Sequence, residues 1–192
     1  MVEHEARQIM TDYYRVWGTY SVDAQGSVAV EGHVSLIKRR PRLGVKFSEI
    51  TGDFGAHGMG LISLQGLPDQ IGGELIISGN KLHNLEGAPR TVKGGMVMDY
   101  MEHTLNSLEG APDHVGGRLR ITYDEQLPLL RCLVAAKVRL EQPASVTAAF
   151  WDKLITCEQI LNDARWMGKG KSGMLNCAME LKRAGLGGNA RW

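Results

Sequence analysis

The sequence predicts an α/β solenoid: a short leucine-rich repeat stack of about five coils with a parallel sheet, an N-terminal capping helix and a C-terminal helical subdomain. Three stretches, 64–77, 85–98 and 108–121, share the pattern L-x-G-x-P-x-x-[IV]-x-G-x-h-x-h, in which h is apolar. The second glycines of these stretches are 21 and 23 residues apart. The chain also has 24 glycines in 192 residues and no Gly/Ser linker that would account for them.

Residues 1–25 are predicted to form a helical cap. Over 2–17, apolar residues recur at helical spacing between charged residues, with Trp17 as the last of them. A solenoid leaves its apolar core open at each end, so we expect this amphipathic helix to cover the first coil.

Residues 26–125 are predicted to form the solenoid itself. After each repeat glycine the apolar residues alternate, as in Leu75 and Ile77, which is typical of a short strand with one buried face. Gly32 and Gly52 keep the same phase upstream. Because one coil cannot bury both of its apolar sets alone, we expect the coils to stack as neighbouring parallel strands do. The repeat glycines are expected to supply a positive φ or a close approach of the main chain.

Residues 126–192 are predicted to form a basic helical subdomain. Helices are expected over 127–138, 148–155, 158–166 and 172–184. This segment has 10 basic and 5 acidic residues, a net charge of +5, whereas residues 1–125 have 12 basic and 16 acidic residues, a net charge of −4. The formal charge of +1 for the whole chain therefore conceals two oppositely charged parts.

A further set of segments surrounds the repeats. The repeats are preceded by YSVDAQGSVAVEGHV at 20–34, VKF at 45–47 and GDF at 52–54, and the chain closes with ILN at 160–162, GKGKSG at 168–173 and GNARW at 188–192. Together with the repeats, these segments resemble a family of short leucine-rich repeat proteins encoded by tailed bacteriophages. The function of that family is largely unassigned, and the resemblance supplies no catalytic residues.

We expect a non-enzymatic, phage-type protein that binds a host or viral protein through its solenoid surface, with inhibition of that protein during host takeover as one outcome. A structural component of the virion is an alternative. The first residues lack the basic and apolar regions of a signal peptide, and no apolar run approaches the roughly 18 residues of a membrane span. We therefore expect the chain in the host cytoplasm or the virion, without a membrane partner.

The outward side chains of the predicted sheet are the candidate protein-binding surface. They are His33, Ser35, Asp53, Glu74, Ile76, Val97, Arg118 and Arg120, and they run from acidic to basic along the stack. The densest basic cluster of the chain, at 38–42, is predicted to lie in an exposed loop, either solvated or facing an acidic protein.

Nucleic-acid or phosphate binding through the basic C-terminal helices is a second hypothesis. Its candidate contacts are Arg165, Lys169, Lys171, Lys182 and Arg183. The GKGKSG segment lacks the first glycine of a phosphate loop, which must stand five residues before the second. What remains is a glycine-rich, cationic start of a helix, whose free N–H groups could hold an anion.

No pattern in the chain predicts catalysis. There is no G-x-S-x-G elbow, no H-E-x-x-H motif and no C-x-x-C pair. We therefore expect no catalytic residue, no cofactor and no metal. Cys132, Cys157 and Cys177 are expected to be free thiols packed as small apolar side chains.

Overall fold

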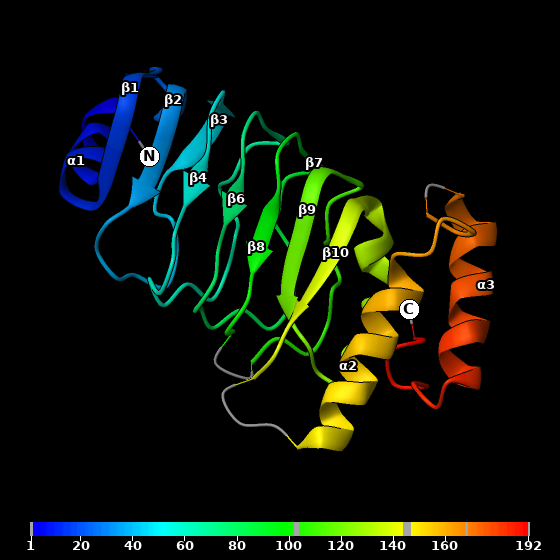
Figure 1. The fold of residues 1–192 in the computed structure, drawn as a ribbon. Coiled ribbons are helices and arrows are strands. Elements are labelled where there is room, and N and C mark those ends of the chain that lie inside the picture. Colours follow the sequence, from blue (N-terminus) through cyan, green and yellow to red (C-terminus); the bar gives the residue numbers. More distant parts are fainter. Residues whose placement is uncertain (1, 102–103, 144–146, 168, 192) are drawn as a thin grey trace.

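The chain forms a parallel-strand β-solenoid of about six turns with helices at both ends (Figure 1). The structure is a computed structural model and describes residues 2–101, 104–143, 147–167 and 169–191. Its elements in chain order are α1 (Glu3–Tyr13), β1 (Tyr14–Val22), β2 (Ser27–Leu36), β3 (Lys46–Ile50), β4 (Phe54–Gly55), β5 (Gln70–Ile71), β6 (Leu75–Ile76), β7 (Thr91–Val92), β8 (Met96–Met98), β9 (His114–Thr122), the 3-10 helix η1 (Leu129–Val134), β10 (Ala135–Glu141), α2 (Ala148–Leu161) and α3 (Gly170–Arg183). The predicted solenoid is present, with about six turns where we expected about five.

The N-terminal cap is half helix and half strand. The predicted helix ends at Tyr13 and not at Trp17, because Tyr14 is extended, with φ −121° and ψ 151°, and begins β1. β1 pairs antiparallel with β2 along its whole length. α1 buries Ala6 and Met10 against the end of the core, which is the covering role that we predicted for it.

Two ladders of parallel strands run through the middle of the solenoid. One ladder joins β2, β3, β5, β7 and β9, and the other joins β2, β4, β6, β8 and β9. The long strands β2 and β9 therefore belong to both ladders. In the second ladder the inward residues stack in register and are buried; they are Val34, Phe54, Leu75, Met96 and Leu119.

The repeat glycines form a hydrogen-bonded column between the two ladders. The main-chain N–H groups of Gly52, Gly73, Gly94 and Gly117 each donate to the carbonyl of the preceding column glycine, beginning at Gly32, over 2.8 to 2.9 Å. A Cβ atom on Gly94 would lie 2.7 Å from both the carbonyl carbon and the oxygen of Gly73. At Gly94, close approach of the main chain is therefore the reason for glycine.

One buried asparagine holds the turn that follows β6. The Nδ2 atom of Asn80 donates to the carbonyl oxygens of Ala56 and Ile77, both at 2.7 Å, and its Oδ1 accepts from Leu61 N at 2.9 Å. The side chain is fully buried. It satisfies main-chain groups of two neighbouring coils that would otherwise be buried without partners.

The solenoid continues where we predicted a helix over 127–138. That segment forms η1 and the start of β10, and β10 pairs parallel with β9. The prediction of a helix holds for the 3-10 helix over 129–134 and is wrong from Ala135 on. There Val138 and Leu140 are buried while Lys137 and Arg139 are exposed, which is the alternation of a strand. The last strand thus lies beyond the predicted end of the solenoid at residue 125.

Two helices follow β10 and pack beside the last turn (Figure 1). α2 covers most of the segment that we divided into helices over 148–155 and 158–166, and it buries Leu154, Cys157 and Leu161. α3 corresponds to the helix predicted over 172–184. The predicted helical subdomain thus begins with η1 and β10, and its two α-helices follow β10.

Candidate binding surface on the outward face of the solenoid

All eight predicted surface residues lie on the outward face of the ladder that contains β4, β6 and β8. Each of them is next in sequence to a buried inward residue, so its side chain points away from the core. They form two adjacent columns: His33, Asp53, Glu74 and Arg118 in one, and Ser35, Ile76, Val97 and Arg120 in the other. The structure therefore brings together residues that are up to 87 positions apart in the sequence.

The acidic end of this surface is ordered by Asp53. Its Oδ1 accepts a hydrogen bond from the main-chain N–H of Glu74 at 2.7 Å. The Nδ1 atom of His33 lies 3.1 Å from Asp53 N and 2.9 Å from Asp53 Oδ2. A neutral imidazole accepts from the amide there, and a protonated one pairs with the carboxylate. Asp53 consequently holds neighbouring coils together and is not a purely solvated charge.

The basic end of the surface contains an ion pair that is partly buried. The Nε atom of Arg120 lies 2.7 Å from Oδ2 of Asp99, whose side chain is only 4% exposed. Arg118 is exposed in the neighbouring column. Arg120 thus neutralises a buried carboxylate, while Arg118 has no hydrogen-bond or ion-pair partner among the described side chains.

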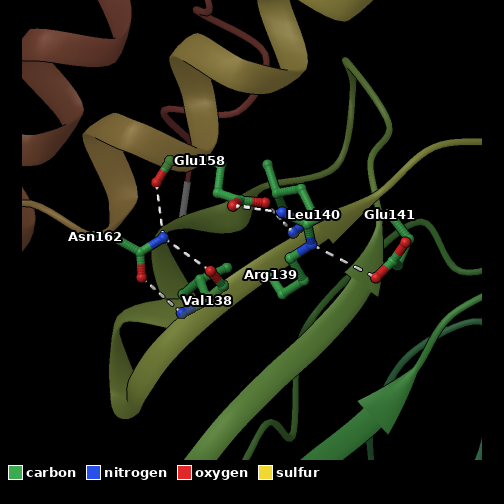
Figure 2. Close-up of polar contacts among 6 residues, drawn as sticks. All are labelled: Val138, Arg139, Leu140, Glu141, Glu158 and Asn162. Atoms are coloured by element: carbon green, nitrogen blue, oxygen red, sulfur yellow. Dashed lines mark hydrogen bonds and ion pairs between the residues drawn. The ribbon is translucent and has the colours of Figure 1, made fainter.

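Two further basic residues extend this end, and the sequence reasoning missed both. β10 places Lys137 beside Arg118 and Arg139 beside Arg120. The guanidinium of Arg139 pairs with Glu158 at 3.1 Å and with Glu141 at 3.6 Å, as Figure 2 shows in part. The period-two alternation over 137–141 was the signal that could have found them.

The resulting surface has an acidic end, an apolar centre and a basic end. Ile76 and Val97 lie opposite each other in the centre and are partly exposed. An apolar centre flanked by charges is the usual arrangement of a protein interface. The register of the paired strands fixes the spacing of these groups.

The residues of the second hypothesis do not converge on one site. Lys169 and Lys171 stand at the start of α3, and Lys182 stands near its end, about 16 Å from Lys171 at 1.5 Å per residue. Arg183 pairs with Glu180 at 3.4 Å.

Arg165 also has a carboxylate partner within its own turn. Its guanidinium lies 2.8 Å from Asp163, and the hydrogen bond from Arg165 lowers the pKa of that carboxyl below its ordinary value. Two of the five candidate cations are thus paired with carboxylates of the same chain.

An apolar cavity of about 380 Å³ lies between the last turns and the start of α2. Its lining includes Met98, Ile121, Tyr123 and Phe150. The rings of Tyr123 and Phe150 pack edge to face, with centroids 5.1 Å apart. The cavity has the size of a small-molecule pocket, but its lining contains none of the predicted surface residues.

The three cysteines are free and buried, as expected. Burial raises the pKa of the Cys132 thiol to about 12, and the same cause raises that of Cys177 to about 12. Burial, followed by the neighbouring thiols of Cys132 and Cys177, also raises the pKa of Cys157. These thiols pack between η1, α2 and α3 and have the environment of structural side chains, not of nucleophiles.

No family model, no curated protein and no solved structure matches the chain. Across the described residues, no group of three or more His, Cys, Asp and Glu side chains is arranged to hold a metal ion. None of the helices in that part of the chain is both long and apolar enough to cross a membrane.

Proposed function

We propose that this chain is a non-enzymatic leucine-rich repeat protein of the phage type, and that it binds a host or viral protein through the outward face of the solenoid. One observation carries the proposal: eight side chains of graded charge share a single rigid face. A partner with a basic region, an apolar contact and an acidic region in the same order would match it. Binding inhibits the partner if the surface that this chain covers is the one through which the partner acts.

The leucine-rich character of the coils supports the same proposal. The repeated Leu residues of each coil are buried, as at Leu61, Leu64, Leu82 and Leu85. Asn80 bonds main-chain groups within its turn, which is the structural use of the asparagine in the leucine-rich repeat pattern. Solenoids of stacked repeats commonly bind partners along such an extended surface.

Charge reversal on the outward face tests the proposal. Glu74 and Arg118 are the appropriate positions, because both are exposed, whereas Asp53 and Arg120 also hold the fold together. The double variant E74K/R118E leaves the net charge unchanged. We expect it to lose a protein that the unmodified chain captures from host lysate, with at least a tenfold weaker affinity for that protein once purified.

A matched control exists on the other ladder. Glu49 and Lys93 are exposed there and border one shallow depression, so E49K/K93E makes the same exchange of charges away from the candidate surface. This control should bind the partner as the unmodified chain does. If E74K/R118E binds equally well, or if both double variants lose binding to the same extent, the outward face is not the interface.

A further inference from the structure

The two outer edges of the sheet differ in whether their free main-chain groups are hydrogen-bonded. At the C-terminal edge, the Oδ1 atom of Asn162 accepts from Val138 N and its Nδ2 atom donates to Val138 O, both at 2.8 Å (Figure 2). Glu158 accepts from Leu140 N at 2.7 Å. Glu158 belongs to α2 and Asn162 is its C-cap residue. Their side chains hydrogen-bond the main-chain groups of β10 to which a further strand would bond. This edge is closed against another strand.

β1 forms the N-terminal edge, and none of the described side chains closes this edge in the same way. Ile37 N donates to Tyr13 O and Asp23 N donates to Ser27 O at the two ends of the β1–β2 pair. Odd-numbered residues of β1 therefore bond to β2, since hydrogen-bonded pairs alternate along an antiparallel ladder in constant register. The N–H and C=O groups of Val16, Gly18 and Tyr20 consequently point to the free edge.

This edge is also accessible and poorly protected by charge. Gly18 is exposed, so the main chain at the middle of β1 is open to solvent. Trp17 is 50% exposed and Tyr20 is 36% exposed. Arg15 is the one charged residue in the nine of β1. No described side chain bonds to the main chain of Val16, Gly18 or Tyr20. Long apolar edges of this kind pair with another strand unless they are blocked.

The charges beside the two ends of β1 indicate which strand fits. At its start, Lys38 and Arg40 lie over the ring of Tyr13, with the Nζ atom and the guanidinium carbon 5.6 and 4.3 Å from the ring centroid. At its end, Glu3 and Arg7 of α1 border Ala24 and pair with each other at 2.9 Å, and the carboxylate of Glu5 in the same first turn leaves this end with an excess of negative charge. A second copy paired antiparallel brings the basic end of each chain to the acidic end of the other, and does so twice.

We propose that two copies of this chain form a dimer by antiparallel pairing of their β1 strands. The free N–H and C=O groups belong to even-numbered residues of β1, so even-numbered residues of the two copies must bond with each other. In the register that places the two Trp17 side chains opposite each other, Val16 of one copy bonds with Gly18 of the other. Residues in such a non-hydrogen-bonded pair have their side chains closest together, which favours aromatic contact. The dimer joins the outward faces of the two solenoids at their His33 ends, since Trp17 lies opposite His33 in each copy. The basic cluster at 38–42 becomes part of the dimer interface.

Sedimentation velocity of the full chain, over a range of protein and salt concentrations, tests the dimer. We expect a species of about twice the 21.1 kDa of one chain, with a dissociation constant that rises at least tenfold as salt screens the end-to-end charge pairs. The variant W17K places two lysines opposite each other and should be monomeric. The control W151K introduces the same change on α2, where Trp151 is 41% exposed, and should remain dimeric.

A second variant tests the dimer independently, in case W17K fails to fold. T19K places a lysine on the same outward side of β1 at an exposed position and should also be monomeric, with an unchanged circular dichroism spectrum. The proposal is overturned if the unmodified chain sediments as a monomer up to about 100 μM, or if W17K and T19K both remain dimeric. A monomeric unmodified chain that still binds its partner protein would refute the dimer and leave the proposed function standing.

Discussion

Replacing Gly94 by alanine tests whether the glycine column is set by close contact between coils. An added Cβ would lie 2.7 Å from both the carbonyl carbon and the oxygen of Gly73, and both atoms belong to main chain that is hydrogen-bonded in the column. Ordinary contacts of a Cβ begin near 3.4 Å, so neighbouring coils must separate by several tenths of an ångström. Overpacking of this kind costs about 1 to 3 kcal/mol of unfolding free energy. In a chain of this length, that corresponds to a fall in Tm of roughly 2 to 12 °C.

Gly187 supplies the matched control for this substitution. A Cβ there meets no atom within 4 Å, and its φ is not in the left-handed region. G187A should therefore leave stability unchanged or raise it by up to about 1 kcal/mol, through the lower entropy of the unfolded chain. Thermal and urea unfolding followed by circular dichroism would measure both variants. If G94A is as stable as the unmodified chain, or if G187A is the more destabilised of the two, close contact does not explain the column.

Three further predictions concern Asn80 and the buried cysteines. N80A should lower the unfolding free energy by about 2 to 4 kcal/mol, because it leaves main-chain groups of Ala56, Ile77 and Leu61 buried without a hydrogen-bond partner. The midpoint of urea unfolding should therefore be markedly lower. An unchanged midpoint would contradict the role assigned to Asn80. The thiols of Cys132 and Cys177 should make stability fall as the pH rises from about 9 toward about 12, because their folded pKa values are raised above the ordinary 9.0 and the unfolded chain releases those protons first. At pH 8 a thiol reagent should label the folded chain far more slowly than the urea-unfolded chain, whereas equal rates would show that the cysteines are accessible.

The repeat pattern predicted the stacked coils because its signals are local. Glycines at 73, 94 and 117 mark contacts between successive coils, and the apolar residues after them alternate as a strand requires. Burial of Leu75, Met96 and Leu119 in one register follows from the period alone. The same period placed the eight candidate surface residues on one face.

Two parts of the fold escaped the sequence reasoning for different reasons. β1 begins inside the segment 2–17 that we predicted as a helix, and it pairs with β2 along its whole length. β10 carries no repeat glycine, so the alternation of Val138 and Leu140 stood alone without the pattern that identified the other strands. A short apolar run does not distinguish strand from helix unless its neighbours in space are known.

The sequence by itself determined the period of the coils, their buried residues and the outward face, because each of these depends on spacing along the chain. Only the tertiary structure decided the extent of the solenoid and the state of its edges. Asn162 and Glu158 close the edge at β10 from a helix some 20 residues further on, and β1 leaves Gly18 and Trp17 exposed at the other edge. The side chains that close an edge are distant in the sequence and come together only on folding, so no local sequence pattern predicts them.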